Sequence, residues 1–278
     1  MKTLLIGAAL AALAAAQSVA AAPIEKPSAA DWRPVDAAHT VVIDTNKGRI
    51  VMELYPTIAP ISVARIEDLT RKHTYDGLTF FRVIDDFMDQ TGDPMNTGEG
   101  GSDQPDIKAE FNFKTQPGFP VVAHPENGGD AGFIGVMPVV SQPAALAALT
   151  ADGKVDASVL YCKGVIGIAR AESPDSGNSQ FFIMRGMKLE LDQKYTAIGR
   201  VVAGQDVADA IKTGEPVEPP RDRMVKVQIL ADMAPADRPN IKVIDTKSAW
   251  FTAYAKREKA SKGADFTPCD LTLASTGK

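Results

Sequence analysis

The chain has 278 residues, of which 45% are hydrophobic and 6% aromatic, and its formal net charge is −5. This length and hydrophobic fraction allow one well-buried core with additional segments, and they exclude a chain that is disordered throughout. The negative charge and the lack of a lysine and arginine cluster argue against nucleic acid as a partner, because neutralising phosphates needs such clusters.

The first residues have the pattern of an export signal. Lys2 gives a positive start, the run from Leu4 to Ala16 is apolar, and small residues around Ala20 offer a cleavage site. The apolar run is shorter than the roughly 20 residues of a membrane span, so we predict residues 1–22 as a signal peptide rather than an anchor. No later stretch reaches spanning length, and we expect a periplasmic or secreted protein without a membrane span.

A lead-in and a hairpin are expected next. Residues 23–38 are rich in proline, alanine and charge, a composition typical of a flexible segment. Two β-runs follow at residues 40–43 and 49–54. The Asn46-Lys47-Gly48 between them suits a tight turn, because asparagine and glycine tolerate positive φ, so the pattern predicts a β-hairpin.

Helices are expected to be few and strands many. An amphipathic helix is predicted to follow Pro60 and to end near Lys72, and a second is predicted from Gln205 to Lys212. The other regular segments are short and β-like, with turn residues between them, at residues 79–84, 164–170, 180–184, 196–202 and 224–230. This combination indicates an all-β dominated fold, either a sandwich or a closed barrel.

Two segments do not fit that pattern. Residues 112–163 are rich in proline and alanine, with a short helix predicted at 144–149, and they resemble an insertion. Residues 232–278 form a C-terminal extension with a helix predicted from Thr246 to Lys262. The central domain is therefore expected at residues 39–231.

The chain offers little for metal or nucleophilic chemistry. Cys162 and Cys269 either form one disulfide, which suits an exported protein, or remain two free thiols. The three histidines are scattered without metal-ligand spacing, and no nucleophile elbow or phosphate-binding glycine motif is present. We therefore expect no metal and no cofactor.

Several segments together carry a family resemblance. In chain order they are residues 47–55, 75–84 with 87–93, 168–170 with 179–183, and 191–195 with 198–201. This series resembles the cyclophilin-type peptidyl-prolyl cis-trans isomerases, of the exported bacterial type. The resemblance implies a closed eight-stranded antiparallel barrel capped by two helices, in a monomer that assists the folding of exported proteins.

The resemblance also implies the site residues. Arg82 stands where the family has its catalytic arginine, and the substrate groove would be formed by Phe87, Met88, Gln90, Ala169, Arg170, Gln180, Phe182, Leu191 and Tyr195. Taken singly, these phenylalanines would be interpreted as core residues and Arg82 as an exposed strand residue. Their assignment to the site therefore depends on the family motif as a whole. The expected partners are proline-containing polypeptides. The alternative is a non-catalytic proline-binding module or chaperone that uses the same groove.

Three positions depart from the best-known relatives. Phe81 stands where many eukaryotic members have histidine, so no acid–base role is assigned there, and Tyr195 also replaces a histidine. Glu190 occupies the position of a tryptophan that makes much of the cyclosporin contact in those relatives. We therefore expect cyclosporin to inhibit this protein weakly.

Overall fold

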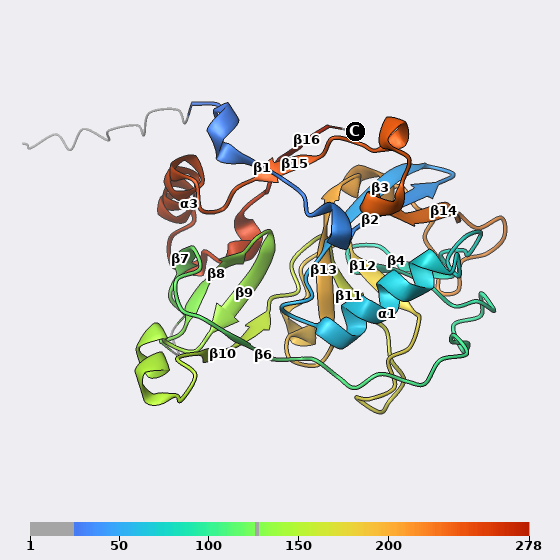
Figure 1. The fold of residues 1–278 in the computed structure, drawn as a ribbon, viewed down its shortest axis with the longest axis horizontal. Helices are drawn as coiled ribbons and strands as arrows, with labels where there is room; N and C mark the ends of the chain where they lie inside the picture. Colours follow the sequence, from blue (N-terminus) through green and yellow to red (C-terminus); the bar gives the residue numbers. More distant parts are fainter. Residues whose placement is uncertain (1–24, 126–127, 278) are drawn as a thin grey trace, which may run out of the picture.

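The computed structural model describes residues 25–125 and 128–277, and most of its regular structure is antiparallel β-sheet (Figure 1). The signal peptide expected at residues 1–22 lies outside the described residues. The expectation of a β-dominated fold is confirmed. The largest sheet has eight strands, in the spatial order β14 (Met224–Ile229), β2 (Thr40–Thr45), β3 (Gly48–Leu54), β13 (Ala197–Ala203), β11 (Val165–Ile168), β12 (Phe181–Met184), β5 (Met88–Thr91) and β4 (Arg82–Ile84).

The strands β2 and β3 form the predicted hairpin. Thr45 pairs with Gly48 across the turn, and Gly48 has a φ of 141°. Side chains on both faces of the hairpin are buried: Ile43 lies in the main core, and Val42 packs in a second cluster with Val243 of the C-terminal extension. Burial on both faces explains why these strands are continuously hydrophobic rather than alternating.

The eight-stranded ladder does not close. Its edge strands β14 and β4 are not paired with each other, and the chain between them makes isolated bridges at Thr79–Arg223 and Val83–Gly214. The intervening segment 215–222 contains three prolines, which have no N–H to donate to a ladder. The expected closed barrel is therefore wrong, and the main sheet is a curled half-barrel.

Two helices accompany this sheet, as expected. They are α1 (Pro60–Arg71) and α2 (Gln205–Asp209), the second shorter than predicted. The carboxylate of Glu110 accepts hydrogen bonds from the free backbone N–H groups of Ile61 (3.0 Å) and Ser62 (2.8 Å) at the start of α1. The helix buries a face that includes Val63, Ile66 and Leu69, and it packs against β14. In the described part of the chain, no helix has the length and apolar character needed to cross a membrane.

The inserted region 112–163 contains a second sheet, which was not predicted from the sequence. Its five antiparallel strands lie in the order β6 (Phe113–Thr115), β10 (Val155–Val159), β9 (Met137–Ser141), β8 (Asp130–Ile134) and β7 (Val121–Ala123). The predicted short helix is the 3-10 helix η3 (Ala144–Leu149), which follows β9. Figure 1 shows this sheet, drawn in green, beside α3 and away from α1.

The C-terminal extension packs on the inserted sheet. Its helix α3 (Ala249–Lys262) brings Phe251 into edge-to-face contact with Phe133 of β8, with 5.4 Å between ring centroids. The extension also supplies β15 (Lys242–Ile244) and β16 (Ser275–Thr276), which join β1 (Trp32–Pro34) in a third sheet. The remaining 3-10 helices are η1 (Ala29–Asp31), η2 (Ala37–His39), η4 (Leu189–Leu191), η5 (Leu230–Asp232), η6 (Pro235–Asp237), η7 (Gly263–Asp265) and η8 (Pro268–Asp270).

Cys162 and Cys269 form a disulfide, which decides between the two alternatives that the sequence left open. The bond joins residues 107 positions apart, with 5.0 Å between their Cα atoms. Cys162 ends the inserted region and Cys269 lies in η8. The disulfide therefore ties the insertion to the C-terminal extension.

The segment expected to be a flexible lead-in holds η1, β1 and most of η2, and it contacts the half-barrel through Arg33. The guanidinium of Arg33 donates from Nη1 and Nη2 to the two carboxylate oxygens of Glu53, each at 2.7 Å, and Glu53 is 2% exposed. Burial alone would raise the pKa of Glu53, but the hydrogen bonds and charge of Arg33, together with the hydrogen bonds from Tyr55 and the N–H of Asp36, hold the pKa below its ordinary value. Tyr55 completes the group, since its hydroxyl donates to Glu53 at 2.5 Å and accepts from the N–H of Val136 at 2.9 Å.

We expect Arg33→Met to lower the free energy of unfolding by about 2–4 kcal/mol, because it leaves the buried carboxylate of Glu53 without its counter-ion. The loss should begin to shrink as the pH falls through about 4, near the ordinary pKa of glutamate, and should disappear below the lowered pKa of the folded state, where the carboxyl is protonated in both states. Urea unfolding at several pH values measures both effects. The control is Arg49→Met, which removes a pair with Asp44 that is about one-third exposed and should cost less than about 1 kcal/mol. Equal losses for the two variants would contradict the prediction.

Candidate active site

Nine of the ten residues expected at the site line one cavity of about 90 Å³. They come from the half-barrel strands β4, β5 and β12, the turn between β4 and β5, the 3-10 helix η4, and the loops that follow β11 and η4. None of them belongs to the inserted region, so the insertion does not fill this cavity. The lining residues are Arg82, Phe87, Met88, Gln90, Ala169, Arg170, Phe182, Leu191 and Tyr195.

Strand register brings the central residues together. Arg82 is directly opposite Gln90, Gln90 is opposite Phe182, and Phe182 is opposite Gly167. Directly opposed residues of antiparallel strands place their side chains on the same face, so one row crosses four strands. A Cβ atom on Gly167 would lie 2.4 Å from Cζ of Phe182, so glycine at this position leaves the space that the ring occupies.

The guanidinium of Arg82 is held from two sides. Its Nε donates to Oε1 of Glu215 at 2.7 Å, its Nη2 lies 2.6 Å from the same oxygen, and its Nη1 donates to Oε1 of Gln90 at 3.3 Å. Gln90 in turn donates from Nε2 to Oε1 of Gln180 at 2.9 Å. Glu215 was not among the predicted site residues, because its neighbours form no motif. It is brought to Arg82 by backbone pairing between distant segments, Gly214 with Val83 and the N–H of Val217 with the carbonyl of Phe81 (2.8 Å).

We expect Glu215→Ala to lower kcat/KM for a peptide substrate by roughly three- to tenfold, mainly through kcat, because the guanidinium loses the group that orients it. Glu215→Gln should lose less of its kcat/KM, since an amide oxygen can still accept a hydrogen bond from Nε of Arg82. Glu218→Ala is the matched control in the same loop, where the side chain is exposed. A rate change of the same size in Glu218→Ala would show that Glu215 has no specific role.

Aromatic rings form the wall of the cavity. Phe182 stacks on Tyr161 with 5.9 Å between centroids and meets Tyr195 edge-on at 5.8 Å. The guanidinium of Arg170 lies 4.5 Å from the centroid of Tyr195, and its Nε and Nη2 donate to the carbonyl of Lys194 at 3.1 and 3.0 Å. The contacts of Arg170 therefore hold the loop of Tyr195 in place, so it supports the wall.

Tyr161 was not among the predicted site residues, because it lies at the end of the insertion and outside the family segments. It is 1% exposed, and its backbone N–H donates to Oδ1 of Asp192 at 2.8 Å. Burial raises the pKa of Asp192 to about 6, although this hydrogen bond opposes the rise. Asp192 follows Leu191, so the end of the insertion supports both Phe182 and the loop that carries Leu191.

The comparisons with known proteins agree with this geometry. The model of the "Cyclophilin type peptidyl-prolyl cis-trans isomerase/CLD" family matches residues 40–231. The chain belongs to the cyclophilin-type peptidyl-prolyl cis-trans isomerases. A probable peptidyl-prolyl cis-trans isomerase of Brucella suis is 32% identical over 80% of this chain and 96% of its own. The crystal structure of cyclophilin AquaCyp293 from Hirschia baltica has a TM-score of 0.80 and 34% identity, covering 88% of this chain and 93% of the other.

A second hollow of this cyclophilin adjoins the first. It has a volume of about 550 Å³ and shares Gln90, Ala169 and Arg170 with the smaller cavity. Gln180, the tenth predicted residue, lies here, and its Nε2 donates to the carbonyls of Gly98 (3.0 Å) and Gly100 (2.8 Å). A bound polypeptide can therefore extend from the apolar cavity into a polar one.

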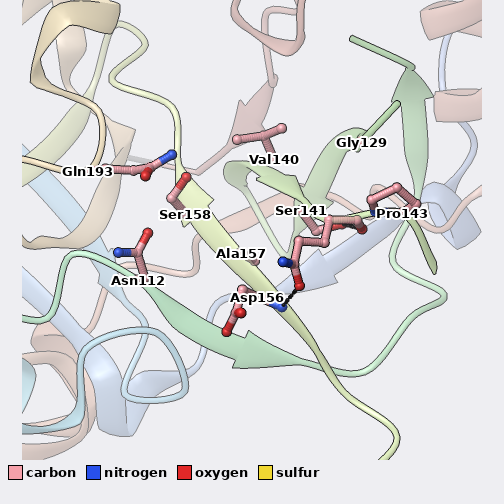
Figure 2. Close-up of a pocket in the computed structure, with 10 residues that line it drawn as sticks. Asn112, Gly129, Val140, Ser141, Pro143, Asp156, Ala157, Ser158 and Gln193 are labelled. Atoms are coloured by element: carbon pink, nitrogen blue, oxygen red, sulfur yellow. Dashed lines mark hydrogen bonds between the residues drawn. The ribbon is translucent and has the colours of Figure 1, made fainter. Parts of the chain in front are cut away.

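A third hollow, of about 270 Å³, lies over the inserted sheet of this cyclophilin (Figure 2). Its lining is mostly polar, and it includes Gln142, whose Oε1 accepts from the N–H of Asp156 at 3.1 Å. Asn112 and Gln193 face it from the side opposite Pro143. None of the residues that line the apolar cavity lines this one, so the two are separate sites.

Proposed function

We propose that this cyclophilin catalyses cis–trans isomerisation of Xaa-Pro bonds in polypeptides, with the prolyl ring in the apolar cavity and Arg82 as the catalytic residue. The observation that carries the proposal is one juxtaposition. Arg82 lies at the rim of a cavity walled by Phe87, Met88 and Phe182, and its Nη1 contacts Gln90 rather than a carboxylate. An apolar cavity can hold the prolyl ring, and a cationic hydrogen-bond donor beside it can reach the prolyl nitrogen.

The chemistry requires little more. A peptide bond resists rotation by roughly 18–20 kcal/mol, because the lone pair of nitrogen is delocalised into the carbonyl. In the twisted state the pair returns to nitrogen and can accept a hydrogen bond from the guanidinium. That bond is hardly available in the planar state, so it stabilises the transition state selectively. Arginine suits the role because it stays protonated at physiological pH.

The apolar wall has a separate task. Holding the pyrrolidine ring still lets the carbonyl on its N-terminal side rotate, and excluding water strengthens the hydrogen bond from Arg82. A few kcal/mol from each effect give an acceleration of several powers of ten, since about 1.4 kcal/mol corresponds to tenfold. The direct test is turnover of a proline-containing peptide, measured with a coupled protease and by NMR exchange. Binding without turnover would leave the rival function, a non-catalytic proline-binding module.

We place this activity in the folding of exported proteins, where uncatalysed isomerisation takes tens to hundreds of seconds. The export pattern of residues 1–22 and the disulfide support an oxidising compartment. Expression of the full chain in a Gram-negative bacterium tests this. We expect a mature protein that begins near residue 23 in the periplasm or the medium. An uncleaved chain in the cytosol would refute the proposal.

Weak inhibition by cyclosporin is expected, with Glu190 as the cause. Glu190 lies on η4 beside Leu191, is exposed, and offers a charge where the best-known relatives offer an indole. We expect Glu190→Trp to tighten cyclosporin binding by at least about tenfold, or roughly 1.4 kcal/mol, by adding an apolar contact surface. Glu172→Trp, an exposed position on another loop, is the control. Nanomolar affinity of the unmodified protein would refute the prediction.

A further inference from the structure

A cavity of about 330 Å³ lies away from the active site, where the half-barrel meets the C-terminal extension. Three parts of the chain form it: the insertion through Val136, the half-barrel through β13 and Gly164, and the extension through the segment that follows Cys269. None of its lining residues lines the active-site cavity. Its apolar walls are formed by Val136, Val201, Val202, Val243, Leu271 and Leu273.

The cavity contains a buried cation without a counter-ion. Arg200 is 9% exposed, its Nη1 donates to the carbonyl of Val136 at 3.1 Å, and it makes no ion pair with any residue that the structure describes. The other arginine that is buried in the described part of the chain, Arg185, pairs with the carboxylate of Asp89, and the partly buried Arg33 pairs with Glu53. Burying an unpaired charge costs several kcal/mol. A guanidinium at the wall of a cavity can instead pair with an anion that enters it.

A second polar group, the side chain of Gln205, belongs to the lining of the same cavity. The Oε1 atom of Gln205 is buried and has no partner among the described residues. Its orientation is fixed, because Nε2 of Gln205 donates to the carbonyl of Met184 (3.3 Å) and to Asp209 (3.1 Å). A Cβ atom on Gly164 would lie 3.0 Å from this oxygen and 3.7 Å from Nε of Arg200. The cation and the unpaired acceptor therefore lie close to the same point of the cavity wall, at Gly164.

These three features describe one ligand chemistry. A ligand that matches this cavity carries an anionic group for Arg200, a hydrogen-bond donor for Gln205 and an apolar group for the walls. We propose that the cavity binds an N-acylated apolar α-amino acid with a free carboxylate, which is the chemistry of a polypeptide C-terminus. The carboxylate pairs with Arg200, the amide N–H donates to Oε1 of Gln205, and the side chain packs on Val202, Val243 and Leu273. The volume suits such a ligand, since small-molecule pockets begin at roughly 300 Å³.

Lys163 at the edge of the cavity does not compete for the anion, because its Nζ pairs with Asp209 at 2.7 Å. The proposed site is therefore centred on one cation. It also lies beside the disulfide at Cys269, so an occupant would contact the insertion, the half-barrel and the extension at once.

The test uses calorimetric titration and thermal unfolding of the full mature protein with N-acetyl-leucine. We expect saturable binding and a rise in melting temperature. The neutral N-acetyl-leucinamide should not bind, and 4-methylpentanoate, which lacks the N–H, should bind more weakly. The tetrapeptide Ala-Ala-Ala-Leu distinguishes the source of the ligand: its binding indicates polypeptide C-termini, and binding of N-acetyl-leucine alone indicates a small metabolite.

Variants locate the binding. Arg200→Met should weaken the binding of N-acetyl-leucine by at least about tenfold, because the charge-assisted ion pair with the carboxylate is lost. Without ligand, this variant should not lower the melting temperature, because it removes an unpaired buried charge, and it should leave peptide isomerisation unchanged. Arg223→Met, a matched change at an exposed position, should bind as the unmodified protein does. Leu273→Trp fills the cavity and should abolish binding. No binding to the unmodified protein, equal binding of the neutral amide, or full binding by Arg200→Met would overturn the proposal.

Discussion

Replacing Arg82 by alanine is expected to lower kcat/KM for a Xaa-Pro peptide by roughly 100- to 1000-fold, which is the usual effect of removing one preorganised donor from a transition state. The affinity for the peptide should change little, because the ring is held by Phe87, Met88 and Phe182 rather than by the guanidinium. The loss should appear in kcat, since the hydrogen bond forms only in the twisted state. Progress curves at several peptide concentrations separate kcat from KM.

Two further variants test whether the loss is specific to the guanidinium of Arg82. Arg82→Lys keeps the charge but loses the planar fork, so we expect activity between those of the unmodified protein and Arg82→Ala. Arg257→Ala removes an arginine from α3, where its partner is Glu258, and should not change the rate. If Arg82→Ala isomerised the peptide as fast as the unmodified protein, the mechanism would be wrong and the groove would serve binding alone. A variant that lost rate and affinity equally would place Arg82 in ground-state binding.

The grouping of the candidate site residues could be predicted from the sequence, because most of them lie in short contiguous motifs. Residues 81–91 and 180–184 carry alternating side chains, and one register fixes Arg82, Gln90 and Phe182 in a row. Strand pairing translates such local motifs directly into spatial neighbours. Glu215 and Tyr161, which were not predicted, reach the site through contacts between distant segments, which no local pattern encodes.

The fold was predictable where periodicity was strong and not where it was weak. The helix α1 and the hairpin of β2 and β3 have long, regular patterns. In the inserted region, β8 and β9 have five residues each, and glycine in β8 and proline in β9 interrupt the β-pattern. The strand β8 packs Ala131 and Phe133 in a cluster with Phe251 and Ala255 of α3, more than 100 residues away in the chain, and β9 packs Met137 and Val139 in the main core. The closed barrel failed for a related reason, since the prolines of residues 215–222 prevent the last pairing.

Removing the disulfide is expected to produce the largest loss of stability. The bond between Cys162 and Cys269 closes a loop of 107 residues, and the chain-entropy model gives about 4–5 kcal/mol for a loop of that length. We therefore expect Cys162→Ala with Cys269→Ala to lower the melting temperature by roughly 10 °C, at about 2–4 °C per kcal/mol for a chain of this size. Alanine is the right replacement, because Cys162 is fully buried and a serine hydroxyl there would need a partner.

The same variant should affect catalysis only mildly, and this separates stability from function. Tyr161, which precedes Cys162, stacks on Phe182. Loss of the disulfide should therefore make the end of the insertion more mobile and the position of Phe182 in the cavity wall less fixed. The half-barrel strands that carry Arg82 and Phe182 do not depend on the disulfide, so below both melting temperatures the loss in kcat/KM should stay under about tenfold. Dithiothreitol provides the control: it should lower the melting temperature of the unmodified protein to that of the double variant and leave the variant unchanged. Equal melting temperatures with and without the bond would mean that the packing of Phe133 on Phe251 already holds the insertion to the extension.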